Sequence, residues 1–128
     1  MKSILLHEPE ASIFDIVTLT LQEEGYQIRP LLKPDHPKFI TELTKSRPEL
    51  ILMDCYRDLS DSAAWCKAIR SVVAGICIVA FSCNNDIDKT YRSIGFDAYL
   101  KKPFDISYMI GLVNRCTSQK KQGLQTQL

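Results

Sequence analysis

Four polar residues that can act together in phosphoryl chemistry each follow a short, largely apolar run. They are two carboxylates, a hydroxyl and an ammonium: Glu8, Asp54, Ser82 and Lys102. An aspartate can be the nucleophile toward phosphorus, a hydroxyl and an ammonium can bind phosphoryl oxygens, and acids can hold Mg²⁺. Such catalysis depends mainly on positioning and charge neutralisation, so it requires few residues. These residues are far apart in the sequence, so the fold must bring them together.

The runs before Asp54 and Ser82 have the pattern of buried strands. Leu50–Asp54 reads LILMD, four apolar residues that end in a carboxylate, and the nearly all-apolar run 76–81 ends at Ser82. Short apolar runs of this kind are typical of strands buried on both faces of a parallel sheet. Open α/β sheets place their ligand sites at the carboxyl ends of the strands. Asp54 and Ser82 are therefore expected at that edge, with Glu8 and Lys102 at the ends of two other strands.

The rest of the chain alternates between strand and helix patterns. Further strand candidates span residues 3–7, 26–31 and 98–100, and residues 56–62 form a predicted loop. The predicted helices carry apolar stripes, namely Ile13, Ile16, Val17 and Leu21; Phe39, Ile40 and Leu43; Trp65, Ala68, Ile69 and Val72; Ile87, Tyr91 and Ile94; and Ile106, Met109, Ile110 and Val113. This alternation predicts the α/β class, with a doubly wound, five-stranded parallel sheet, (βα)5, and helices on both faces. Residues 1–117 form the expected domain, and residues 118–128 a disordered tail.

Composition narrows the function classes. The 128 residues contain 16 Lys and Arg against 15 Asp and Glu, a net charge of +1, which disfavours direct nucleic-acid binding. The sequence shows neither a secretory leader nor an apolar run of membrane-spanning length, so we expect a cytoplasmic protein that does not bind membranes. The five cysteines include no C-x-x-C pair, and His7 and His36 match no zinc-finger spacing. Free thiols are therefore favoured over disulfides or a zinc site.

Three longer segments carry a resemblance to a known family. They are EEGY at residues 23–26, RPELILMD at 47–54 and GFDAYLKKPF at 95–104. Together with the order of Glu8, Asp54, Ser82, Tyr99 and Lys102, they resemble the receiver domain of two-component response regulators, the CheY-like superfamily. The resemblance covers residues 3 to about 117 and implies a flavodoxin-like fold.

The resemblance also implies roles for individual residues. Asp54 would accept a phosphoryl group from a sensor histidine kinase or a phosphotransfer protein, and the phosphorylated chain would act on a downstream protein target. Ser82 and Lys102 would contact the phosphoryl group, and Tyr99 would turn inward as Ser82 moves. The Lys102–Pro103 peptide bond would be cis. Mg²⁺ would be held by Glu8, Asp54 and the backbone carbonyl of Tyr56.

One departure from the family concerns the metal. Receivers carry two adjacent acids after the first strand, whereas an ungapped alignment places Glu8 and Pro9 there. Proline has neither a side-chain oxygen nor an N–H, so Mg²⁺ binding is expected to be weakened. Glu10 is a further candidate ligand, acting through a water, and Asp58 is another. The alternative register, with His7 and Glu8 as the pair, requires an insertion before Gly25.

Two functions therefore stay open at the level of sequence. The first is a single-domain phosphoacceptor that signals by a conformational switch, with self-dephosphorylation rather than classical enzyme activity. The second is a pseudo-receiver that binds partner proteins without phosphorylation, which Pro9 favours. Considered without its neighbours, a serine such as Ser82 is more often a strand-end hydroxyl that bonds the backbone than a functional group. Considered in the same way, Tyr99 would be a core residue. For Cys55 and Cys83 the preferred interpretation is a buried small hydrophobe, and for His7 a packed or edge histidine.

Overall fold

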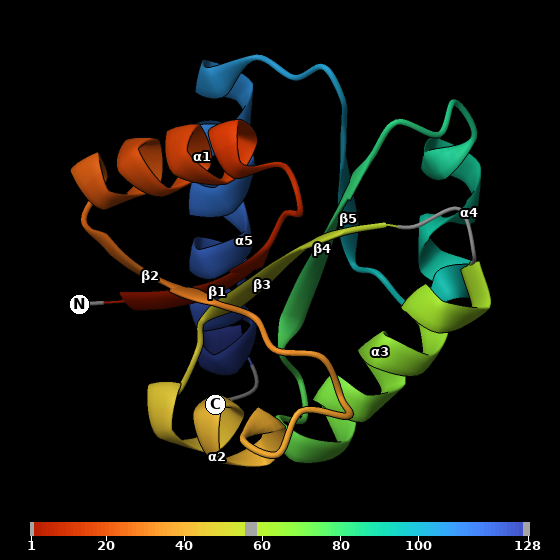
Figure 1. Cartoon of the computed structure of the whole chain (residues 1–128). Helices are drawn as coiled ribbons and strands as arrows, with labels where there is room; N and C mark the ends of the chain where they lie inside the picture. Colours follow the sequence, from red (N-terminus) through yellow and green to blue (C-terminus); the bar gives the residue numbers. More distant parts are fainter. Residues whose placement is uncertain (1, 56–58, 127–128) are drawn as a thin grey trace.

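The computed structural model describes residues 2–55 and 59–126, with a five-stranded parallel sheet at its centre (Figure 1). The strands are β1 (Lys2–His7), β2 (Tyr26–Pro30), β3 (Leu50–Asp54), β4 (Cys77–Ser82) and β5 (Ala98–Lys101). Their order across the sheet is β2-β1-β3-β4-β5. The order reverses next to β1, so the carboxyl ends of β1 and β3 lie side by side at the switch point.

Helices cover both faces of the sheet, as the sequence predicts. They are α1 (Ala11–Glu23), α2 (Phe39–Ser46), α3 (Leu59–Val72), α4 (Ile87–Ile94) and α5 (Ile106–Thr126). Figure 1 shows α1 and α5 on one face and α2, α3 and α4 on the other. Two apolar clusters of buried side chains match these two layers. The prediction of a flavodoxin-like (βα)5 fold is confirmed.

The central strands are buried because both of their faces are covered. The first four residues of β3 are buried, and Asp54 is the point at which burial begins to fall. In the parallel register Asp54 pairs with Phe81, so Ser82 is the next residue along β4. At the edges, β2 ends at Pro30, the position expected for a residue that has no N–H to donate.

Helix ends follow the expected local chemistry. Arg47 closes α2 in the left-handed region, with a φ of 47°, and Pro48 follows it. Gly95 closes α4 with a φ of 127°, and a Cβ there would lie 3.1 Å from the Cβ of Cys66. Glycine at this position therefore satisfies both the turn and the packing of α4 on α3.

Two details of the helices differ from the sequence prediction. Helix α3 begins at Leu59, so residues 59–62 are helical rather than part of a loop. Three residues of the predicted apolar stripes are exposed: Ile16 of α1 by 50%, Ile40 of α2 by 63% and Ile106 of α5 by 44%. Each helix needs only one narrow apolar stripe to cover the sheet, and these side chains lie outside it.

The last helix extends to Thr126, so the backbone is helical over most of the segment 118–128, for which the sequence predicts a disordered tail. The domain boundary at residue 117 stays a prediction. Within the part of the chain that the structure describes, no helix is both long and apolar enough to cross a membrane.

A cluster of charged and backbone groups stabilises the amino ends of β4 and β5; we call Arg70 and Asp97 the amino-end cluster. The Arg70 guanidinium donates to the carbonyls of Ile76 at 2.7 Å and Gly95 at 2.8 Å, and to Asp97 Oδ2 at 2.7 Å. The same Asp97 oxygen accepts the backbone N–H of Ile78 at 2.9 Å. The cluster therefore joins the end of α3 to the starts of two strands.

Candidate functional site

Three of the predicted site residues meet at the carboxyl edge of the sheet, and we call Glu8, Asp54 and Lys102 the carboxyl-end cluster. Lys102 Nζ donates to Asp54 Oδ1 at 2.8 Å and also to Glu8 Oε1. The side chains of Lys102, Asp54 and Glu8 are 12%, 17% and 1% exposed. The residues come from the ends of β5, β3 and β1, which share one edge of the parallel sheet, and the long side chain of Lys102 reaches past β4 to the other two.

Glu8 is the buried member of the cluster because the local chain holds its second oxygen. Glu8 Oε2 accepts the backbone N–H of Glu10 at 3.1 Å, across the intervening Pro9. The Glu10 carboxylate itself points elsewhere, accepting the hydroxyl of Ser12 at 3.4 Å. Both oxygens of Glu8 are therefore committed to hydrogen bonds within the protein.

Two opposing effects act on Lys102. Burial disfavours the ammonium, whereas the hydrogen bonds and charges of Asp54 and Glu8 favour it. The two carboxylates outweigh burial, so the pKa of Lys102 is raised above its ordinary value of 10.5. Lys102 is therefore charged at neutral pH. The cluster holds two carboxylates for one ammonium, so a negative charge remains beside Asp54 after the lysine is paired.

Ser82 lies on the same edge but makes different contacts. Its side chain is buried, and its Oγ accepts the backbone N–H of Asn84 at 3.0 Å. Its carbonyl accepts the N–H of Lys102 at 2.7 Å, and the neighbouring carbonyl of Phe81 accepts the N–H of Cys55 at 2.7 Å. Backbone hydrogen bonds thus join the ends of β3, β4 and β5. The Lys102–Pro103 peptide bond is cis, as the resemblance implies.

Tyr99 is half-buried on β5 and packs against an aromatic of the neighbouring helix. Its ring centroid lies 5.0 Å from that of Tyr91 on α4, and the Arg92 guanidinium lies 5.3 Å from the centroid of the Tyr91 ring. The sequence assigns Tyr91 only to the apolar stripe of α4. The structure shows it as the contact through which Tyr99 meets α4.

Of the remaining candidates near the site, His7 and Cys55 pack against other side chains, whereas Cys83 is exposed. His7 packs against Trp65 with ring centroids 4.8 Å apart, and burial lowers its pKa despite the nearby carboxylate of Asp54. Cys55 is half-buried, and burial raises its pKa. Cys83 is exposed, so its interpretation as a buried small hydrophobe is wrong. It follows the last residue of β4, where the chain leaves the sheet toward the surface.

The metal ligands expected from the resemblance are only partly assembled. Among the described residues there is no group of three acidic, histidine or cysteine side chains suited to a metal ion. Glu8 is committed to Lys102 and to the chain beyond Pro9, and Tyr56 and Asp58 lie outside the described residues. Asp54 is the more exposed of the two carboxylates. Since Mg²⁺ can bind through one or two carboxylates and waters, Asp54 is the residue of this set that could hold the ion.

A groove of about 430 Å³ opens beside Lys102. Its apolar walls come from α1, from the segment between β5 and α5 and from the start of α5, and its polar members are Glu10, Cys83 and Lys102. The apolar lining is Ile13, Ile16, Val17, Pro103, Phe104 and Ile106. Phe104 stacks on Phe81 at 5.3 Å, which anchors one wall to the sheet. Ile16 and Ile106 are 50% and 44% exposed. The sequence does not predict this groove, although exposed apolar residues on two elements are its signal.

No family model matches the chain. The sensory transduction protein RegX3 of Mycolicibacterium smegmatis is 25% identical over 114 residues, which cover 88% of this chain and 49% of that protein. A CheY-like response regulator receiver domain from Methanospirillum hungatei superposes with a TM-score of 0.78 at 16% identity, covering 96% and 98% of the two chains. The receiver domain of a sensor histidine kinase from Pseudomonas aeruginosa, solved with magnesium in its active-site cleft, gives 0.72 at 22% identity, with coverage of 91% and 98%.

In sequence the chain is similar to response regulators, and in fold it is similar to CheY-like receiver domains. It spans about half the length of the curated relatives that it matches. The order of the five strands is that of the CheY-like fold. The meeting of Glu8, Asp54 and Lys102 on one edge is the arrangement that the resemblance implies. Pro9 follows Glu8, at the position where the resemblance implies a second acid.

Proposed function

We propose that this receiver accepts a phosphoryl group on Asp54 from a sensor histidine kinase or a phosphotransfer protein, and passes the signal to a downstream protein. The observation that carries the proposal is the hydrogen bond of Lys102 to Asp54 at the carboxyl edge of the sheet. A structural aspartate at a strand end requires no buried ammonium from a strand two positions away. A phosphoacceptor does, because the transferred group brings oxygens that a fixed cation stabilises.

The chemical step is an in-line displacement at phosphorus. A carboxylate oxygen of Asp54 forms the new P–O bond while the P–N bond of the donor phosphohistidine breaks, and the imidazole leaves. Lys102 lies within reach of the oxygens that become negatively charged, and it is held charged by Glu8. Mg²⁺ bound by Asp54, Glu8 and the Tyr56 carbonyl, with Glu10 as a further candidate, would neutralise charge on the phosphoryl oxygens; Pro9 would weaken that binding.

The proposed switch uses Ser82 and Tyr99. In this structure the Ser82 hydroxyl accepts a hydrogen bond from the Asn84 backbone, and Tyr99 packs on Tyr91. A phosphoryl group on Asp54 would offer new acceptor oxygens to the Ser82 hydroxyl. Its movement would change the segment that leads into α4, and Tyr99 would leave Tyr91 as that helix adjusts.

A small phosphodonor tests the acceptor directly. Incubation with acetyl phosphate and Mg²⁺ is expected to give a single phosphate-sized mass increase on the intact chain, removed by hydroxylamine, which cleaves acyl phosphates. Asp54→Ala abolishes it, whereas Asp88→Ala, which removes an exposed aspartate of α4, leaves it unchanged. Failure to label the wild-type chain at any Mg²⁺ concentration would favour the alternative, a pseudo-receiver that binds partners without phosphorylation.

The groove beside Lys102 is the surface we propose for the phosphodonor protein. Exposed Ile16 and Ile106 offer apolar contact close to the cluster. We expect Ile16→Glu to keep labelling by acetyl phosphate but to lose transfer from the autophosphorylated domains of a panel of histidine kinases. Leu19→Glu is the matched control, because Leu19 is exposed on the same helix and does not line the groove. Equal losses in both variants would argue against this surface.

A further inference from the structure

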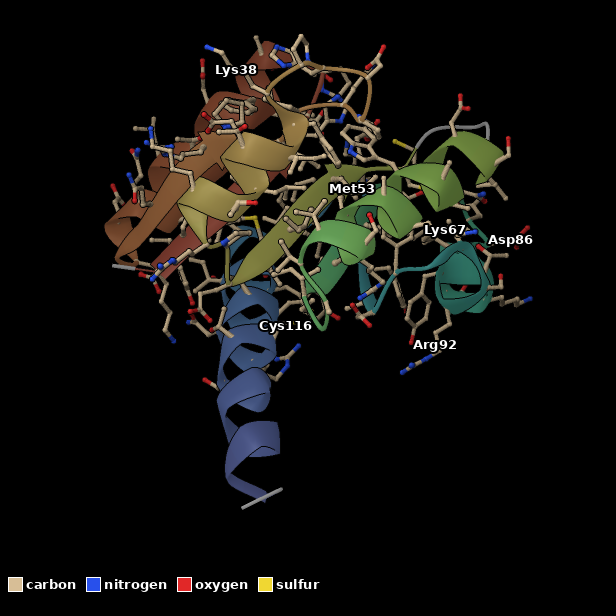
Figure 2. All side chains as sticks on the ribbon, turned by 90° about the horizontal axis from the view of Figure 1, so that it is seen from below. Lys38, Met53, Lys67, Asp86, Arg92 and Cys116 are labelled. Carbon is tan, nitrogen blue, oxygen red and sulfur yellow. The ribbon has the colours of Figure 1, made fainter. Side chains whose placement is uncertain are left out.

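Two cysteines far apart in sequence meet on the face of the sheet that α1 and α5 cover. Cys77 is the first residue of β4, and Cys116 lies on α5. Each is half-buried and packs against the same apolar cluster, which contains Val79, Met109 and Val113. Figure 2 labels Cys116 on the part of α5 that lies next to the strands. Both thiols therefore lie at the edge of the core rather than deep inside it.

Helix α5 packs on β4, and the two side chains interact there. The interaction between the two sulfurs lowers the pKa of Cys116 and raises the pKa of Cys77, so Cys116 is the better thiolate. The neighbouring Arg115 also favours the Cys116 thiolate, while burial and Asp97 oppose it. At Cys66, by contrast, burial raises the pKa to about 12. The thiolate is the reactive form of cysteine, so Cys116 has the character of an attacking sulfur and Cys77 that of a resolving one.

We propose that Cys77 and Cys116 are a redox modification site, which a hydroperoxide converts into a reversible disulfide between β4 and α5. In the first step the Cys116 thiolate attacks one oxygen of hydrogen peroxide; the O–O bond breaks, hydroxide leaves, and Cys116 becomes a sulfenic acid. In the second step the Cys77 sulfur attacks the Cys116 sulfur, the S–O bond breaks, and water leaves with the Cys77 proton. The two sulfurs are oxidised and the peroxide is reduced. A dithiol returns both to the reduced state by exchange.

The site is separate from the carboxyl-end cluster. Cys77 pairs with Leu50 at the start of β3, whereas Asp54 pairs with Phe81 near the other end of β4. A disulfide at Cys77 would fix α5 to the amino end of the sheet without contacting Asp54. The expected physical effect is therefore a higher melting temperature of the oxidised chain, with labelling of Asp54 by acetyl phosphate retained.

The test uses the full chain, treated with hydrogen peroxide under native conditions and then alkylated. None of the five cysteines forms a disulfide, and we expect the oxidised chain to lose two alkylatable thiols. Proteolytic mapping should give one linked peptide pair that contains Cys77 and Cys116, and dithiothreitol should restore all five thiols. A link between Cys55 and Cys66, or loss of thiols without a Cys77–Cys116 link, would overturn the proposal.

Single variants separate the two roles. Cys77→Ser should leave Cys116 as a sulfenic acid that dimedone traps, whereas Cys116→Ser should give neither the link nor a dimedone adduct at Cys77. Cys83→Ser is the matched control, since Cys83 is exposed and outside the pair, and it should form the link as the wild-type chain does. Alanine variants at both positions guard against a serine that merely disturbs the core, and folding is checked by thermal unfolding. Equal dimedone labelling at Cys77 and Cys116 would contradict the assigned order of attack.

Discussion

The sheet carries an ion cluster at each end, and the two differ in how their charges are satisfied. In the amino-end cluster, one cation meets one carboxylate, and both complete their hydrogen bonds with backbone groups of Ile76, Gly95 and Ile78. In the carboxyl-end cluster, one cation is shared by two carboxylates. The first arrangement connects elements of the fold. The second keeps a carboxylate in excess, which costs stability.

The largest effect is expected when the carboxyl-end cluster loses its cation. Lys102→Met should lower the free energy of unfolding by about 3 kcal/mol at pH 7, because two poorly solvated carboxylates then face each other without a counter-charge. Urea unfolding measures it. Adding Glu8→Gln to Lys102→Met should recover part of the loss. If the double variant is no more stable than the single one, repulsion between the carboxylates is not the cause.

The same ammonium sets an alkaline limit on stability. The pKa of Lys102 is raised above 10.5 in the folded chain, so folding favours the protonated form. Its contribution is complete below the unfolded value of 10.5 and is lost as the pH rises through the folded pKa. We expect wild-type stability to fall in that window and the Lys102→Met variant to show a shallower fall. Identical slopes would contradict the shared-cation arrangement.

A smaller loss is expected in the amino-end cluster. Arg70→Met should cost about 2 kcal/mol, because two backbone carbonyls and one carboxylate lose a charged donor while remaining partly solvated. Arg92→Met is the comparison, because the Arg92 guanidinium contacts the exposed side of Tyr91 rather than backbone carbonyls. It should cost less than about 0.5 kcal/mol. Urea unfolding compares the two. Equal costs would mean that the hydrogen bonds of Arg70 do not stabilise the fold more than the contact of Arg92 with Tyr91.

The two aspartates give the sharpest contrast. Asp97→Asn should cost about 1 kcal/mol, because Asp97 Oδ2 accepts from both Arg70 and Ile78. Asp54→Asn should change stability by less than about 0.5 kcal/mol or increase it, because it removes one of two carboxylates that compete for Lys102. Thermal unfolding of both variants decides the matter. A large loss for Asp54→Asn would make Asp54 a structural residue like Asp97.

The smallest effect concerns acid pH. Burial lowers the pKa of His7 below 6.5, so the unfolded chain takes up the proton first and stability declines as the pH falls below 6.5 toward the folded value. His7→Phe should flatten this part of the stability curve, whereas His36→Phe, at an exposed histidine, should not. If both variants keep the wild-type slope between pH 7 and 5, another group is responsible.

Sequence alone was sufficient for what depends on local pattern. The apolar runs before Asp54 and Ser82 mark the two central strands, and alternation with helical stripes leaves the doubly wound sheet as the consistent arrangement. The carboxyl-edge position of Asp54 follows from the same rule. The cis bond at Lys102–Pro103 followed from family resemblance and not from pattern.

What was missed depends on contacts between distant residues. Nothing in the sequence around Arg70 or Asp97 signals that they meet, since their partners are mainly backbone groups, which every residue has. The start of α3 at Leu59 was obscured because the next three residues, Ser60 to Ser62, are polar and resemble a loop. Periodicity places Ile16 and Ile40 on the apolar stripes of their helices, but it does not show how much of each stripe contacts the sheet. Both residues lie outside that contact and are exposed.

The edges of the sheet bear on how copies of this chain can associate. Strand β2 ends at Pro30, which has no backbone donor, and β5 has only four residues, with exposed Lys101 at its end and Pro103 soon after. Short edge strands, charges and prolines all discourage pairing with a strand from another molecule. Self-association by extension of the sheet is therefore disfavoured at both sides. Complexes of this chain should form through helix faces and loops, which can separate again without breaking a continuous hydrogen-bonded ladder.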